Sequence, residues 1–332
     1  MTFRLAEPDT ADGATPGWIV ADGTITKDSA DQFRTFLRTK KISVGARTEV
    51  FLNSRGGNLF GGLSLGEVIR EYGLGTKVAR SIPDPPHGGE YVTESEGTGL
   101  CLSACAFTFL GGKSRIAADR TIGVHQHYDP AALQEPQKQF TAADLSSEQI
   151  ISGILADYVV RMGVDARFLT RASSASPTEI YLFTSDEMYQ FAITWKDSEY
   201  MPWALEAYRD GLIAVSKTRN EQEVATLFCR KGKSLSLLLS IPYFGSANDD
   251  LSPIINGATV DVFGTEIPSS NISAKIEKNH LVFEFRLPSE FKIKNDATYG
   301  MGAVGSFRQL YYHDFPARNF LTYLRLVSRN CF

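Results

Sequence analysis

Long apolar runs and an excess of positive charge are both missing from this sequence of 332 residues. A transmembrane helix needs about 20 consecutive apolar residues, and no segment approaches that length. Lysine and arginine number 34 against 38 aspartates and glutamates, so the net charge is -4. Surfaces that bind nucleic acid through its phosphates are usually basic. We therefore expect a soluble chain with no membrane span and no DNA or RNA partner.

Histidine and cysteine are also scarce, with five and four residues. The histidines do not form a zinc-binding pattern, and no Gly-Lys-Ser/Thr phosphate loop follows a predicted strand. We predict no metal, no other cofactor and no ATP binding by this chain alone.

The cysteines fall into two pairs, Cys101 with Cys105 and Cys229 with Cys331. An even number permits two disulfides in an oxidising compartment, and four buried free thiols are the alternative. Side chains at i and i+4 of a regular helix are too far apart for a disulfide. Cys101 can therefore bond Cys105 only if it lies before the helix begins.

The length allows two domains, and the pattern of the sequence changes near residue 198. Residues 1–16 contain three acidic residues, two prolines and a glycine, and they predict a flexible leader. Residues 17–197 alternate strands, Gly turns and helices in βαβ order, which predicts an α/β domain with a mostly parallel sheet. Its expected strands are 18–25, 48–53, 76–80 and 121–126. Its expected helices are 27–39, 63–72, 103–110, 142–162 and 185–191.

Residues 198–222 predict a connector, and residues 223–332 a small, mostly antiparallel β domain. Apolar and polar side chains alternate there, as expected of half-buried strands. The expected strands are 224–229, 234–241, 259–263, 272–277 and 281–287. The tail, 317–328, fits a helix or a last strand.

Two Pro-containing loops interrupt the α/β domain, at 81–99 and 128–141. Clusters of Pro and Gly cannot form a regular element. The first loop directly precedes the segment around Ser103, so it fits a lid over a substrate site or a passive insertion.

Three short segments hold a candidate nucleophile, oxyanion donors and a base. Ser103 begins an apolar helix, the Gly56-Gly57 turn follows the strand 48–53, and His125 lies near the end of the strand 121–126. A serine hydroxyl needs a base within hydrogen-bond reach and amide donors for the developing oxyanion. The combination predicts acyl transfer at Ser103, whereas a helix-capping serine and a structural histidine are the alternative interpretation. His127 alternates with His125 and is expected to face the other way.

The motifs Leu52-Asn-Ser-Arg-Gly-Gly, Cys101-Leu-Ser-Ala-Cys and Gly123-Val-His-Gln resemble those of the Clp-type serine peptidases and their signal-peptide-peptidase relatives. The Cys-x-Ser-Ala-Cys form looks most like an exported bacterial branch of that group. The resemblance covers roughly residues 17–195. It implies a crotonase-like fold, a peptide or protein substrate, a periplasmic location and a small homo-oligomer.

By this resemblance Ser103 is the nucleophile, His125 the base, and the amides of Gly57 and Ala104 the oxyanion hole. Two further positions are implied to bind substrate, Gly56 and Arg55. Arg55 replaces the proline usual in the family, and it either binds a substrate carboxylate or lies in solvent.

The acidic third member of the triad is missing from its expected place. Glu179 is the nearest carboxylate when the family's closing strand is matched to this sequence. Asp129 and Asp165 are weaker substitutes, and a Ser-His dyad is a further possibility.

Taken together, the sequence predicts a serine peptidase that acts without ATP through an acyl-enzyme on Ser103. The main alternative is a catalytically degenerate binding or assembly scaffold of the same fold, which the misplaced acid and Arg55 favour. An acyl-CoA hydratase or thioesterase ranks last, because the paired glutamates of hydratases are missing.

Overall fold

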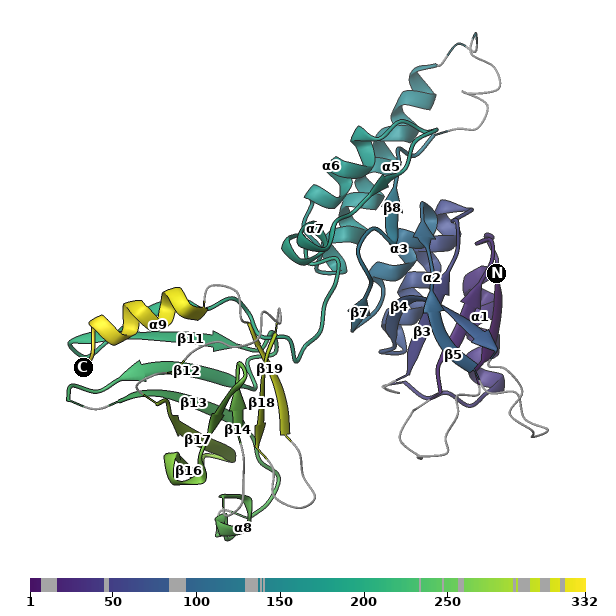
Figure 1. The fold of residues 1–332 in the computed structure, drawn as a ribbon. Coiled ribbons are helices and arrows are strands. Elements are labelled where there is room, and N and C mark those ends of the chain that lie inside the picture. The colour runs from purple at the N-terminus through teal and green to yellow at the C-terminus, as the bar shows by residue number, and fades with distance from the viewer. Residues whose placement is uncertain are drawn as a thin grey trace. The chain divides into compact units, whose positions relative to one another are not determined.

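The computed structural model describes residues 1–6, 17–44, 48–83, 94–128, 137, 139, 141–232, 234–246, 248–255, 260–288, 291, 299–304, 311–316 and 320–332. The chain is a mixed α/β protein with several sheets (Figure 1). It divides into two compact units, Met1–Lys196 and Asp197–Phe332, and each has its own apolar core. Within the described ranges, no helix is both long and apolar enough to cross a membrane.

The larger sheet of the first unit has the strand order β1-β2-β3-β4-β5, with β7 beside β4. The central strands β2, β3 and β4 are parallel, as is β7 to β4, whereas β1 and β5 run antiparallel to their neighbours. Helix α1 connects β2 to β3, and α2 connects β3 to β4, so the predicted βαβ order is observed. The bounds are β1 Thr2–Leu5, β2 Ile19–Asp22, α1 Ser29–Thr39, β3 Glu49–Asn53, α2 Leu59–Glu71, β4 Gly75–Pro83, β5 Glu94–Thr98 and β7 Arg115–Ile116.

Both faces of this sheet are covered, which explains why its strands are apolar without strict alternation. On one face, Ile19 and Leu52 pack into the main core together with the apolar side chains of α1 and α2. On the other face, Trp18 stacks on Phe51 with ring centroids 4.7 Å apart, in a second small cluster.

Two expectations about the edges of this sheet were wrong. Residues 2–5, assigned to a flexible leader, form β1, where Phe3 packs on Phe33 with ring centroids 4.8 Å apart; residues 7–16 lie outside the described part. Residues 94–98, assigned to a loop, form β5 against an extended β4. The proposed lid falls largely on residues 84–93, also outside the described part.

In the described part of the first unit, a three-stranded sheet and the helices α3, α5, α6 and α7 follow the larger sheet. Strands β6 and β8 are parallel, and β9 runs antiparallel to β8. The predicted strand 121–126 ends at Val124, so His125 and His127 follow it. The bounds are β6 Cys101–Leu102, α3 Ala104–Leu110, β8 Ile122–Val124, α5 Ala142–Arg161, α6 Arg167–Ser174, β9 Tyr181–Leu182 and α7 Ser185–Gln190.

Helix α3 is buried on every side, and glycines let α2 approach it closely. A Cβ on Gly62 would lie 2.6 Å from the carbonyl oxygen of Ala104, and one on Gly66 would lie 1.9 Å from the hydroxyl of Tyr158. That hydroxyl donates a hydrogen bond of 2.9 Å to the carbonyl of Phe107. The helix that begins beside Ser103 is therefore fixed by close packing.

The second unit contains two antiparallel sheets, ordered β10-β11-β12-β13-β17-β16 and β15-β14-β18-β19. Alternate side chains of β13 and β17, such as Leu237, Leu239 and Phe283, enter its core. The bounds are β10 Ala204–Tyr208, β11 Gly211–Lys217, β12 Val224–Cys229, β13 Leu235–Pro242, α8 Ser252–Ile255, β14 Val260–Val262, β15 Thr265–Ile267, η1 Ser269–Asn271, β16 Ile272–Glu277, β17 His280–Arg286, β18 Tyr299–Val304, β19 Tyr311–Pro316 and α9 Phe320–Arg329.

The expected connector 198–222 contains β10 and β11, so it belongs to this sheet rather than preceding it. All five residues of β10 are exposed, which removes the apolar alternation that would reveal a strand. The tail forms a helix, α9, one of the two expected alternatives.

We predict that Gly66→Ala lowers the free energy of unfolding by about 1–3 kcal/mol, the usual cost of overpacking. Urea unfolding would measure it. In a Tyr158→Phe background the penalty should shrink, because the atom that clashes with the new methyl is gone. Gly153→Ala on α5 is the matched control: nothing lies within 4 Å of the added Cβ, so the higher helix propensity of alanine should stabilise by about 0.5–1 kcal/mol. A Gly66→Ala protein as stable as the parent would contradict the packing argument.

Candidate functional site

Ser103 lies in a sharp turn between β6 and α3. Its φ of 56° and ψ of -123° fall in a region that residues with side chains rarely adopt. The Ser103 amide donates to the carbonyl of Gly123 at 2.8 Å, and the Ser103 carbonyl accepts from Ala106 at 2.9 Å. These backbone bonds hold a conformation that the residue would not choose by itself.

A disulfide between Cys101 and Cys105 spans the same turn. Cys101 belongs to β6, before α3 begins at Ala104, so the sequence condition for this bond is met. Both sulfurs are in fully buried residues. A second disulfide joins Cys229 of β12 to Cys331, beyond α9. Both predicted pairs are therefore bonded.

The hydroxyl of Ser103 and the imidazole of His125 are within hydrogen-bond reach. Ser103 Oγ lies 2.8 Å from His125 Nε2, and His125 Nδ1 lies 2.7 Å from the carbonyl oxygen of Gln126. Because a carbonyl oxygen can only accept, Nδ1 carries the proton and donates to it. Nε2 is then the free acceptor for the proton of Ser103, as a general base requires.

The glycine turn lies directly against the serine turn. Gly56 and Gly57 have φ of 102° and 140°, and Ile25 donates to the Gly56 carbonyl at 2.9 Å. A Cβ on Gly57 would lie 2.1 Å from the carbonyl oxygen of Ile25. Within the described chain, the amides of Gly57 and Ala104 donate to no other residue, and both residues line the same cavity as Ser103.

Gly56 does not line the cavity. It is buried beneath the serine turn, where a Cβ would lie 2.8 Å from that of Ser103. The structure thus gives Gly56 a supporting place rather than the substrate contact that the sequence suggested.

The cavity in front of Ser103 has a volume of about 670 Å³, which is in the usual range for ligand sites. One side of it is apolar and comes from four helices and the residue before β9. The apolar lining comprises Leu59, Ala104, Phe107, Ile151, Leu155, Leu169, Ala172 and Ile180. The polar lining includes Asn58, Gln126, Tyr128, Ser152 and Ser173 beside Ser103 and His125.

Two charged side chains lie in the lining, Arg55 and Glu148. Arg55 is exposed, and its guanidinium forms no hydrogen bond or ion pair with a described residue. Glu148 comes from α5 and is also exposed. Sequence reasoning missed it, because nothing in an amphipathic helix indicates which polar side chain will face a distant serine.

Glu179 is not brought to His125. It is exposed and lies in a neighbouring depression with Ser174, Ala175, Ile180 and Tyr181. Ile180 also lines the cavity in front of Ser103, whereas Glu179 does not. Among the described residues, no carboxylate hydrogen-bonds His125.

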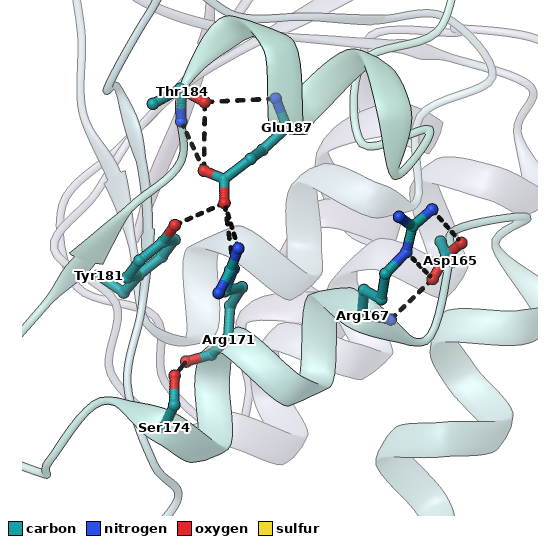
Figure 2. Close-up of polar contacts among 7 residues, drawn as sticks. All are labelled: Asp165, Arg167, Arg171, Ser174, Tyr181, Thr184 and Glu187. Atoms are coloured by element: carbon teal, nitrogen blue, oxygen red, sulfur yellow. Dashed lines mark hydrogen bonds and ion pairs between the residues drawn. The ribbon is translucent and has the colours of Figure 1, made fainter.

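The other two carboxylates considered from the sequence do not replace Glu179. Asp165 forms an ion pair of 2.8 Å with Arg167, whose hydrogen bonds lower the pKa of Asp165 to about 2 (Figure 2). Asp129 lies outside the described residues. Among the described residues, Ser103 and His125 thus form a pair without a carboxylate, and a backbone carbonyl orients the histidine.

His127 also lines the cavity, contrary to the expectation that it faces away. That expectation assumed a strand to residue 126, but β8 ends at Val124 and the alternation ends with it. Among the described residues, no group of three or more His, Cys, Asp or Glu side chains could hold a metal ion.

Comparisons with protein-family models and with curated proteins give no significant match to the chain.

We predict that replacing Cys101 and Cys105 by alanine lowers the free energy of unfolding by about 2 kcal/mol, the entropy that a short disulfide loop removes from the unfolded chain. It should also speed hydrogen exchange at the Ser103 amide, which mass spectrometry or NMR would measure. The matched control is the double alanine variant at Cys229 and Cys331, 102 residues apart. It should cost more stability, about 4–5 kcal/mol, yet leave the Ser103 amide unchanged. Equal exchange at Ser103 in both variants would contradict a local role for the first disulfide.

Proposed function

We propose that the first unit is a serine hydrolase that cleaves peptide bonds. The observation that carries the proposal is the 2.8 Å contact between Ser103 Oγ and His125 Nε2, in a cavity that is also lined by Gly57 and Ala104, whose amides donate to no other described residue. Nucleophile, base and oxyanion donors are the three groups that acyl transfer requires.

The reaction would proceed in two halves. Ser103 Oγ attacks the carbonyl carbon of the scissile bond while His125 Nε2 takes its proton, and the amides of Gly57 and Ala104 stabilise the oxyanion. His125 then gives that proton to the departing amine, which leaves an ester on Ser103. A water molecule, deprotonated by His125, hydrolyses the ester and restores the serine hydroxyl.

A peptide substrate is supported by the resemblance of the three motifs to Clp-type peptidases, and that resemblance also supports a crotonase-like fold for the first unit. The apolar lining from α5 and α6 suits an apolar side chain next to the scissile bond. Two disulfides are compatible with an exported protein.

A binding or assembly scaffold of the same fold is the second candidate. It is favoured by the dyad, because no carboxylate of a described residue stabilises a protonated His125. The two candidates differ in whether Ser103 is reactive.

A fluorophosphonate probe tests the hydrolase directly. We expect the wild-type protein to be labelled, Ser103→Ala to take no label, and His125→Gln to be labelled at least about a hundredfold more slowly, because it lacks the general base. Glu179→Gln is the matched control and should be labelled at the wild-type rate, since Glu179 lies outside the cavity. A wild-type protein that takes no label would support the scaffold instead.

Arg55 and Glu148 predict a charge preference at the same site. For two peptides that differ only by Glu or Gln near the scissile bond, the acidic peptide should have the lower KM. Arg55→Gln should reverse that preference, because Glu148 then acts alone, and should raise the KM of the acidic peptide about fivefold, which corresponds to about 1 kcal/mol for an exposed ion pair. Glu148→Gln should have the opposite effect, because it removes a like charge. If neither substitution changes the ratio of the two KM values, the charged residues do not select the substrate.

A further inference from the structure

A carboxylate outside the cavity joins three elements around it. Glu187 of α7 accepts a hydrogen bond of 2.5 Å from the hydroxyl of Tyr181 on β9 and pairs with Arg171 of α6 at 2.9 Å (Figure 2). Its other oxygen accepts from the amide and hydroxyl of Thr184, both at 3.2 Å, which completes the capping box of α7. The Glu187 side chain is 16% exposed, so its contacts are largely shielded from water.

Helix α6 is one of these elements, and its C-terminal end binds Gln126, the residue whose carbonyl orients His125. At the end of α6, the carbonyl of Ser173 accepts from Gln126 Nε2 at 2.8 Å, and the carbonyl of Ala175 accepts from the Gln126 amide at 3.1 Å. The carbonyl of the same Gln126 accepts from His125 Nδ1. The position of that carbonyl therefore depends on where α6 ends.

Strand β9, the second element, pairs with the strand that precedes His125. Tyr181 lies opposite Val124, and Leu182 opposite Gly123. The segment 123–126 is thus held by β9 before His125 and by α6 after it. Glu187 contacts β9 through Tyr181 and α6 through Arg171.

We propose that Glu187 is a positioning residue for His125, which fixes the spacing between β9 and α6 and so the direction of the imidazole. The family resemblance makes Glu179 the candidate that orients His125, whereas Glu187 orients it indirectly, without contacting the imidazole. The inference rests on the proposed hydrolase function only where it concerns the reaction, since the position of the imidazole can be measured separately.

The charges around Glu187 agree with this role. Partial burial raises the pKa of Glu187, but the hydrogen bonds from Tyr181 and Thr184 and the charge of Arg171 outweigh that effect, and the net pKa is lowered. The carboxylate is therefore ionised at neutral pH and can hold both partners.

The ion pair of Asp165 and Arg167 on the same helix provides a matched control. Arg167 lies at the beginning of α6, and Arg171 lies one turn further along (Figure 2). Asp165 is half-buried and Arg167 is exposed, and the hydrogen bonds that this pair forms with described residues reach neither β9 nor Gln126.

The test compares Glu187→Gln, Tyr181→Phe and Asp165→Asn with the wild-type protein, at a temperature where circular dichroism shows all four folded. The first readout is the exchange rate of the His125 Nδ1 proton with water, by NMR of protein with ¹⁵N-labelled histidine and with His125→Gln to assign the signal. The second is the rate of fluorophosphonate labelling at Ser103 as a function of pH.

We expect Glu187→Gln to speed the exchange and to slow the labelling, each about tenfold, because small displacements of a general base are costly. Tyr181→Phe should act in the same direction, and Asp165→Asn should change neither rate. If Glu187→Gln speeds the exchange but the wild-type protein takes no label, the positioning role is supported and the hydrolase is rejected. The positioning role would be overturned if the wild type is labelled but Glu187→Gln changes neither rate, or if Asp165→Asn changes both rates as much as Glu187→Gln does. Either result would leave the hydrolase proposal intact.

Discussion

The turn at Ser103 is the constraint on which the site depends. A serine at φ 56° is held by its surroundings rather than by its own preference. Those surroundings are the β6–β8 pairing, the disulfide across the turn, and Gly56 packed beneath it. The same turn places Ser103 in the cavity lining and begins a helix at Ala104, whose amide donates to no other described residue. The strained backbone at Ser103 and the placement of its hydroxyl are thus consequences of the same turn.

His125 has a weaker orienting partner than the aspartate of a full triad. The carbonyl of Gln126 fixes the tautomer as well as a carboxylate would, because it too can only accept. As a dipole, however, it stabilises a protonated imidazole less than a full negative charge does. A hydrolase of this design is expected to depend more on its oxyanion donors and on accurate placement of the base. This reliance gives the contacts of Glu187 their importance, although no atom of that residue lies in the cavity lining.

The βαβ core was predictable because its signals are local. Buried parallel strands such as Glu49–Asn53 read as apolar runs, and Gly73 marks the end of a helix. The edge strands β1, β5 and β10 were missed because they are largely exposed and carry no such signal. At the site, Ser103 and His125 were found from short motifs and lie together. The role predicted for Glu179 depended on aligning the start of one strand with that of the family. An error of one residue there changes which side chain faces the site: Ile180 lines the cavity and Glu179 does not. Gln126 belongs to the Gly123-Val-His-Gln motif, but it orients His125 through a carbonyl that every residue has, and its bonds to the end of α6 depend on the fold, so the motif alone did not indicate this role.

The two sides of the cavity are built by different means. On the serine side, a covalent bond and glycine contacts that admit no side chain hold β6, α2 and α3 together. On the other side, much of the apolar lining comes from α5 and α6. Helix α6 is held by the buried side chains of Phe168 and Ala172 and by the polar contacts of Arg171 and Ser173. Substitutions such as those at Ile151 or Leu169 can therefore change the shape of the lining without disturbing the Ser103 turn. In the proposed hydrolase, the nucleophile and the oxyanion donors are held by one half of the site, whereas the other half shapes much of the apolar lining and orients His125 through Gln126.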